Sequence, residues 1–458
     1  MLMPGLGARR PDSEDGPEDQ GDAFMTVLMY TLGVVLFAVG LAASIGLHEV
    51  GHMVPAKKFG VKVTQYFVGF GKTLWSTKRG ETEYGVKAIP LGGYVKLVGM
   101  LPPGPNDPET GLIRKSNTGM FTQLVSDARA AEYEFVERGD EDRLFFKLPW
   151  WKKVIVMAGG PTVNLVIAFL LFGGVFMLHG VPEPKTTVAE VSDCVIAASE
   201  GNRVCTDADP LAPAKQAGLK SGDRIISMNG TPVTSWDQFT GLIRANDDGN
   251  AVIVYERDGR QRTATTNTTV SPRPSIESPG KFVEAGFLGV EPVQVLEKQG
   301  PGFVVAYMGD STWEVVKAIG QLPVKLVHVA KAAVGVEERA ADSPMSVVGA
   351  SRVAGEVASA DEIPIADRFV SLLMLLGAVN LFVGMLNFIP LLPLDGGHIA
   401  GALYEAVRRA FAKIFRRPDP GYFDVAKLLP VAYVMAAVFL VMSVVLVFAD
   451  IVAPVRLG

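Results

Sequence analysis

The sequence predicts a polytopic α-helical membrane protein with four transmembrane helices, a membrane-associated β-hairpin region and a small α+β domain outside the membrane. Three observations predict this fold class: four long apolar blocks, basic residues in the connections after the first and third blocks, and strand-like patterns after the first and second blocks. A bilayer core needs about 20 apolar residues. The blocks cover residues 25–47, 154–178, 369–394 and 428–452. The net charge of −5 is too mild to indicate a nucleic-acid partner, and we expect none.

The N-terminal part begins with an acidic tail, residues 1–23, for which we expect disorder. The first transmembrane helix is expected within residues 24–60. A cleaved signal peptide is the alternative interpretation. It is disfavoured because the apolar block is longer than a signal core of about 7–15 residues and ends without a small-residue cleavage site.

A metal-binding motif, His-Glu-x-x-His, stands at the end of this first block. Residues four apart lie on one face of a helix, so His48 and His52 can bind the same metal ion. Glu49 is then placed to act as general base and acid on a metal-activated water. A catalytic zinc takes three protein ligands and keeps one position open, so the sequence must supply a third ligand.

Residues 61–153 are expected on the cytoplasmic side, because lysines and arginines are frequent after the first block and cytoplasmic loops carry an excess of them. β-formers alternate with glycines in the first part of this segment, which indicates short strands and hairpins. The second transmembrane helix is expected at 154–178, directly after two tryptophans and two lysines typical of a membrane interface.

The segment that follows is expected outside the cytoplasm as an α+β domain over residues 179–300 and a helical linker over 301–368. Asp258-Gly259 is a strong hairpin turn pair. Helical spacing over 303–335 predicts a helix that is interrupted at Pro323. Cys194 and Cys205 lie in this oxidising compartment, so a disulfide is expected, with two unpaired thiols as the alternative.

The third transmembrane helix is expected at 369–398, with its regular part broken before Asp395 by Asn387 and two prolines. The first and third spans both run inward, so His48 and Asp395 reach the same membrane depth. Asp395 is therefore the favoured third ligand, with a helix cap or turn residue as the alternative, and His398 is a weaker candidate. A basic cytoplasmic loop (399–427) and a fourth helix (428–452) complete the chain.

Three motifs carry a resemblance to a known family: "HEVGH", "NFIPLLPLDGGH" and "AGLKSGD". The chain resembles the site-2 protease family, and more closely the bacterial RseP-like intramembrane zinc metalloproteases of the actinobacterial type, with one PDZ-like domain. The resemblance implies a Zn²⁺ endopeptidase of the cell membrane, with the N-terminus, PDZ-like domain and C-terminus extracytoplasmic. It implies the metal ligands His48, His52 and Asp395, and Glu49 as the catalytic residue.

The same resemblance implies a substrate and the residues that bind it. The substrate would be a single-pass membrane protein of the anti-sigma-factor type, already cut outside by a site-1-type protease. The PDZ-like domain would bind a peptide C-terminus or exclude large ectodomains, although its motif also fits a turn in any small β domain. The implied substrate-binding residues come from the second span, the third span and the hairpin region: Asn164, Asn387, Pro390, Gly92, Gly93, Tyr94 and Val95.

Two other function classes fit part of the pattern. A membrane-anchored PDZ scaffold with a structural metal site would also bind zinc, but it would close the metal with four protein ligands. A metal transporter would need further rows of ionisable residues in the spans, and the first, second and fourth blocks offer none. An intramembrane zinc endopeptidase is the function that the sequence favours.

Overall fold

The computed structural model describes residues 19–102, 120–134, 136–200, 203–275 and 282–455. It divides into two compact units, one formed by Phe176–Gly300 and the other by Asp15–Val175 with Pro301–Leu457. Each unit is described by itself. Four helices among the described residues are long and apolar enough to cross a membrane, which confirms the predicted spans: Ala23–Lys58, Trp150–His179, Ile365–Asn387 and Val425–Val452.

The first helix, α1 (Asp19–Lys58), starts inside the acidic tail for which we expected disorder. That expectation is wrong for residues 19–23, and residues 1–18 lie outside the described part. The helix runs through the apolar block without a break and ends at Lys58.

The centre of the larger unit is the packing of α1 against α3 (Trp150–Gly174), which in turn packs against α8 (Ile365–Asn387). The contact between α1 and α3 is very close: a Cβ added at Gly159 would lie 2.0 Å from the carbonyl oxygen of Gly51. Small residues at helix interfaces let backbones approach in a membrane, where apolar side chains gain little by leaving lipid. The two glycines thus bring the end of α1 against the start of α3.

The third span differs from its predicted bounds. α8 ends at Asn387, residues 388–394 form no helix, and α9 (Asp395–Ile414) begins at Asp395. The expected break is present, but the predicted helix 369–398 and loop 399–427 are wrong, since most of that loop is helical. After α9 come η4 (Val425–Leu428) and α10 (Leu429–Val452).

The predicted interruption at Pro323 is also wrong. α6 (Pro301–Ala333) continues through this proline as one helix. Its last turns pack against α10 in an apolar cluster that contains Val329, Ala333, Leu446 and Ala449. The free energy gained by this packing exceeds the cost of the one helix hydrogen bond that a proline cannot donate. The short helix α7 (Val347–Ser359) follows and packs against α1.

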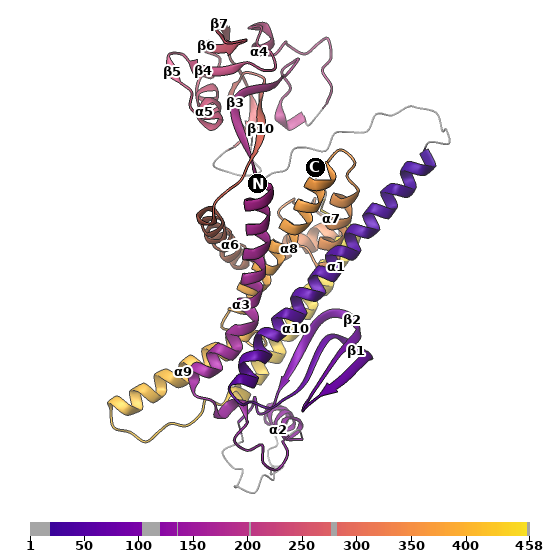
Figure 1. Cartoon of the computed structure of the whole chain (residues 1–458), viewed down its shortest axis with the longest axis vertical. Coiled ribbons are helices and arrows are strands. Elements are labelled where there is room, and N and C mark those ends of the chain that lie inside the picture. Colours follow the sequence, from indigo (N-terminus) through magenta and orange to yellow (C-terminus); the bar gives the residue numbers. More distant parts are fainter. Residues whose placement is uncertain (1–18, 103–119, 135, 201–202, 276–281, 456–458) are drawn as a thin grey trace. The chain divides into compact units, whose positions relative to one another are not determined.

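The segment after α1 is a long antiparallel hairpin of β1 (Val63–Arg79) and β2 (Thr82–Leu97), shown in Figure 1. The hairpin folds back on itself, because Tyr66 pairs with Val95 on one side and with Tyr84 on the other. Residues 65–68 therefore lie between the two halves of β2, and residues 93–97 form an outer edge. α2 (Met120–Tyr133) and η1 (Phe145–Lys147) follow.

The smaller unit contains a sheet with the strand order β10-β3-β4-β6-β7, and β5 pairs with β4 (Figure 1). Ile225, Phe239, Ile253 and Leu288 are fully buried in its core. Its elements are η2 (Val175–His179), β3 (Val181–Val191), η3 (Ala198–Glu200), α4 (Pro213–Gln216), β4 (Arg224–Met228), β5 (Thr231–Pro232), α5 (Trp236–Ala245), β6 (Asn250–Arg257), β7 (Arg260–Asn267), β8 (Thr269–Pro274), β9 (Phe282–Phe287) and β10 (Val290–Glu297).

Two local expectations in this unit are met. The hairpin between β6 and β7 turns at Asp258 and Gly259, both with positive φ (54° and 71°), as a type I′ turn requires. Cys194 and Cys205 are joined by a disulfide. The sheet with its two short helices is consistent with the expected PDZ-like α+β domain.

Candidate active site

Three donor atoms from two helices meet at the end of α1. His48 Nε2 and His52 Nε2 are 3.2 Å apart, and each lies 3.4 Å from Asp395 Oδ2. Zinc bonds of about 2.0–2.2 Å in a tetrahedron place neighbouring ligand atoms about 3.3 Å apart. The three donors thus have the spacing of one face of a zinc tetrahedron, and the residues fit the metal. Within the described residues, this cluster offers three ligands, which leaves a fourth position open.

The two helices present these donors for simple reasons. The spacing of four residues places both imidazoles on one face of α1. Asp395 is the first residue of α9, directly after the non-helical segment 388–394. His52 Nδ1 donates a hydrogen bond to the Val156 carbonyl oxygen of α3 at 2.8 Å. That bond fixes the tautomer and leaves Nε2 free to bind a metal, as second-shell partners of ligand histidines do.

The site is largely shielded from solvent. The side chains of His48, His52 and Asp395 are 12%, 6% and 20% exposed. A carboxylate and two imidazoles at such depth are costly unless they pair with each other or bind a metal ion. Their burial therefore adds an independent reason to treat the cluster as a metal centre.

Gly160 is a site residue that the sequence did not reveal. A Cβ added there would lie 2.3 Å from His52 Nε2 and 2.7 Å from His48 Nε2. Real Cβ contacts are not that short, so only glycine leaves the two imidazoles in this position. The signal was present as the adjacent pair Gly159-Gly160 inside an apolar span, since paired small residues there indicate close backbone approach.

The proposed catalytic residue, Glu49, lies beside the outer edge of the folded hairpin. A Cβ added at Gly93 of β2 would lie 3.2 Å from Glu49 Cγ and 3.1 Å from Ile45 Cγ2. The predicted substrate-binding strand, Gly92 to Val95, is therefore next to α1 at the position of the metal motif. Gly93 pairs with Val68 on the inner side, and no further strand of the described residues pairs with the outer side.

Asn164 lies one turn after Gly160 on the same face of α3. Its side chain is buried, and its Oδ1 has no hydrogen-bond partner among the described residues. An unpaired buried amide oxygen is costly, so this atom is ready to accept a hydrogen bond from a ligand. Asn387 is half-buried at the end of α8, and Pro390 is exposed in the segment before Asp395.

Within the described residues, the other three histidines are not part of this ligand cluster. His398 is half-buried one turn into α9 and is not among the clustered ligands. His328 of α6 is paired with Glu337 at 2.7 Å. His179 belongs to the smaller unit.

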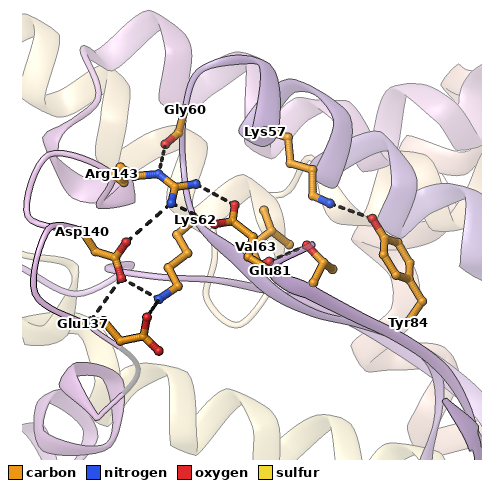
Figure 2. Close-up of polar contacts among 10 residues, drawn as sticks. Lys57, Gly60, Lys62, Val63, Glu81, Tyr84, Glu137, Asp140 and Arg143 are labelled. Carbon is orange, nitrogen blue, oxygen red and sulfur yellow. Dashed lines mark hydrogen bonds and ion pairs between the residues drawn. The ribbon is translucent and has the colours of Figure 1, made fainter. Parts of the chain in front are cut away.

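A network of polar contacts holds the base of the hairpin, as Figure 2 shows. Lys62 Nζ lies 2.5 Å from Asp140 Oδ2 and 3.1 Å from Glu137 Oε2. Arg143 donates two hydrogen bonds to the Glu81 carboxylate, at 2.6 and 2.8 Å. The Lys62 partner lowers the pKa of the Asp140 carboxyl below its ordinary value. These pairs tie the residue before β1 and the turn between β1 and β2 to the segment before α3. Lys57 of α1 donates a hydrogen bond to the Tyr84 hydroxyl of β2 at 2.7 Å, which links the hairpin to α1.

Comparison with known proteins decides the family. The model of peptidase family M50 matches residues 36–417, which include the His-Glu-x-x-His motif and Asp395. The chain belongs to peptidase family M50. This is the site-2 protease family, as the three motifs indicated.

Individual members of the family agree with this assignment. The zinc metalloprotease Rip1 of Mycobacterium bovis is 34% identical over 443 residues, covering 94% of this chain and all of the relative. The regulator of sigma-W protease RasP of Bacillus subtilis is 24% identical, covering 83% of this chain and 91% of RasP. The metalloprotease MmpA of Caulobacter vibrioides is 27% identical, covering 81% of this chain and 85% of MmpA.

The family and the four apolar helices together identify an integral membrane zinc metalloendopeptidase with Zn²⁺ as its cofactor. The donor spacing described above agrees with that cofactor. The scaffold and transporter alternatives raised by the sequence are therefore set aside for the chain as a whole.

Proposed function

We propose that this M50 protease cleaves single-pass transmembrane proteins within the membrane, at a zinc held by His48, His52 and Asp395. The observation that carries the proposal is the place of the three donors. Two lie in a helix of membrane-spanning length, and the third stands at the start of the helix that follows another such span. A peptide bond that reaches them must come from a segment at the same depth.

The residues of the chain divide the chemistry among them. A zinc ion at this site supplies Lewis acidity and makes water nucleophilic near neutral pH. Glu49 accepts a proton from the attacking water and later donates it to the leaving amine, so the proton is returned when the peptide bond breaks. His52 is held in one orientation by the Val156 carbonyl, and Gly160 keeps the space beside both imidazoles free.

A helical substrate hides its peptide bonds in internal hydrogen bonds, so it must unwind before it is cut. We propose that the unwound segment pairs with the outer edge of β2 at residues 92–97, which lies beside Glu49. Addition of a strand to a free sheet edge supplies backbone hydrogen bonds along the segment. The unpaired Asn164 Oδ1 would accept a further bond from the freed backbone, and Asn387 and Pro390 would line the other side.

The orientation of the chain follows from its charges. We propose that the hairpin side and the α9 side are cytoplasmic, since basic residues gather there, and that the N-terminus, the PDZ-like domain and the C-terminus are extracytoplasmic. RasP is named a regulator of sigma-W. By analogy, an anti-sigma factor first cut by a site-1-type protease is the proposed substrate class. The PDZ-like domain would bind the new C-terminus or exclude uncut ectodomains.

The test is a comparison of the wild-type protein with Glu49→Gln in cells that lack the natural copy. Single-pass proteins or their stubs should accumulate in membranes with Glu49→Gln, while zinc content stays at the wild-type level. Glu291→Gln, which removes an exposed carboxylate from β10, is the matched control. Equal membrane proteomes for Glu49→Gln and wild type would refute the proposed activity.

A further inference from the structure

The second half of α9 projects away from its neighbouring helices in Figure 1, and several of its apolar side chains are exposed in the described part of the chain. The spacing of these side chains follows the helical repeat, so they form one continuous stripe. The exposed fractions are high for such residues. They are Leu403 45%, Tyr404 53%, Val407 52%, Phe411 57%, Ile414 72% and, just after the helix, Phe415 63%.

Basic residues lie beside this stripe and at the end of α9. Arg408 donates to the Pro420 carbonyl oxygen, and Arg409 is paired with the buried Glu405. Lys413, Arg416 and Arg417 are exposed, and none of them has an ion-pair partner within the described residues. Three free cations thus stand beside the exposed apolar stripe.

A helix with one apolar face, one basic face and exposed aromatic residues is typical of a segment that lies in the membrane interface. The spans before and after α9 also indicate that this helix lies at the membrane surface. The helix starts just after the span α8 and is followed by the span α10, so it leaves and returns to one side of the membrane. Anionic lipid headgroups are the counter-charge available at that depth.

We propose that α9 is a binding site for anionic lipid. Its apolar stripe inserts at the boundary between headgroups and acyl chains, and Lys413, Arg416 and Arg417 bind lipid phosphates. This goes beyond the proteolytic function and does not depend on it. Because α9 begins with Asp395, the lipid contact also holds the helix that carries one proposed metal ligand.

The test uses the full chain with a single reporter. Cys194 and Cys205 are bonded to each other, so Ile414→Cys introduces one free thiol that takes an environment-sensitive fluorophore. The protein is placed in phosphatidylcholine vesicles with 20% of either brominated phosphatidylglycerol or brominated phosphatidylcholine. Bromine quenches a fluorophore that it contacts, so the ratio of the two quenching constants measures the preference for anionic lipid.

We expect brominated phosphatidylglycerol to quench several-fold more strongly, because each cation near an anionic surface contributes about fivefold in affinity. Raising the salt concentration should lower this ratio without any mutation, since such attractions are screened. In the variant Lys413→Gln, Arg416→Gln, Arg417→Gln the ratio should fall toward one. The control variant Lys220→Gln, Arg260→Gln, Lys298→Gln removes the same number of exposed cations from the smaller unit and should keep the ratio.

Three results would overturn the proposal. Equal quenching by the two lipids would show insertion without recognition of charge. An absence of quenching by either lipid would show that the stripe is covered by protein or faces water. Efficient cross-linking between the unlabelled thiols of two copies of the Ile414→Cys variant would assign the stripe to a dimer interface instead.

Discussion

Replacement of Gly160 by alanine is the most informative single change at the proposed metal centre. The added methyl group would stand 2.3 Å from His52 Nε2 and 2.7 Å from His48 Nε2, whereas ordinary contacts begin at 3.4 Å. The imidazoles or the helix must therefore move by about 1 Å. Ligand positions in a metal site tolerate about 0.2 Å.

The expected size of the effect follows from this displacement. Changes that misorient a metal ligand cost about 10- to 100-fold in affinity, and a misplacement of about 1 Å near reacting groups costs about 100-fold in rate. We expect Gly160→Ala to lose zinc to a chelator at a concentration 10- to 100-fold lower than wild type. Cleavage should fall by about 100-fold even when zinc is in excess.

Gly174→Ala is the matched control. It lies in the same helix, and nothing is within 4 Å of the added Cβ. Alanine is a better helix former than glycine by about 1 kcal/mol, so neither variant should lose α3 through helix propensity. If purified Gly160→Ala held zinc against the chelator and cleaved as well as Gly174→Ala, the geometry assigned to the site would be wrong.

Two further predictions concern the hairpin. Proline substitutions scanned through Tyr94–Leu97 should reduce cleavage by about fivefold for each backbone hydrogen bond to substrate that is lost, while the zinc content stays unchanged. The same scan through Trp75–Arg79, at the opposite edge of the folded hairpin, should not reduce cleavage. Equal effects of the two scans would argue against strand pairing. Lys62 holds the pKa of the Asp140 carboxyl below its ordinary value of 3.8. The ionised carboxylate therefore stabilises the folded protein above about pH 4, and this stabilisation is lost as the pH falls through the lowered pKa. Asp140→Asn should lower the free energy of unfolding by about 2 kcal/mol near neutral pH. The difference in Tm between this variant and wild type should shrink below about pH 4. A difference that stays constant with pH would contradict a stabilising role for the Asp140 charge.

The sequence predicted the parts of the fold that depend on local pattern. Long apolar blocks predict spans in any context, and His48 and His52 lie on one face because four residues make about one helical turn. The break before Asp395 followed from Asn387, Pro390 and Pro393, whose effects on the backbone are local as well. The effect of Pro323 could not be predicted without the tertiary packing, since the contacts of α6 with α10 keep this helix continuous through the proline.

Three features were not predicted from the sequence. The role of Gly160 depends on how α3 crosses α1, whereas the pair Gly159-Gly160 indicates only that another backbone comes close. The loop predicted for residues 399–427 rested on the basic residues of that segment, although only Arg408, Arg409 and Lys413 lie in α9 itself. Its apolar residues nevertheless recur with a helical period, and that pattern was the available signal. The folding of the hairpin onto itself depends on pairings between distant halves and also lay beyond local reasoning.

The central claim is that one zinc ion is held by two imidazoles of α1 and the carboxylate that starts α9. X-ray absorption at the zinc edge, on purified protein, tests it most directly. We expect one zinc per chain with two imidazole ligands and oxygen ligands at about 2.0–2.2 Å. We also expect the metal to be lost, or the spectrum changed, in both His48→Ala and Asp395→Ala. A wild-type spectrum in Asp395→Ala, or a zinc site closed by four protein ligands, would contradict the account.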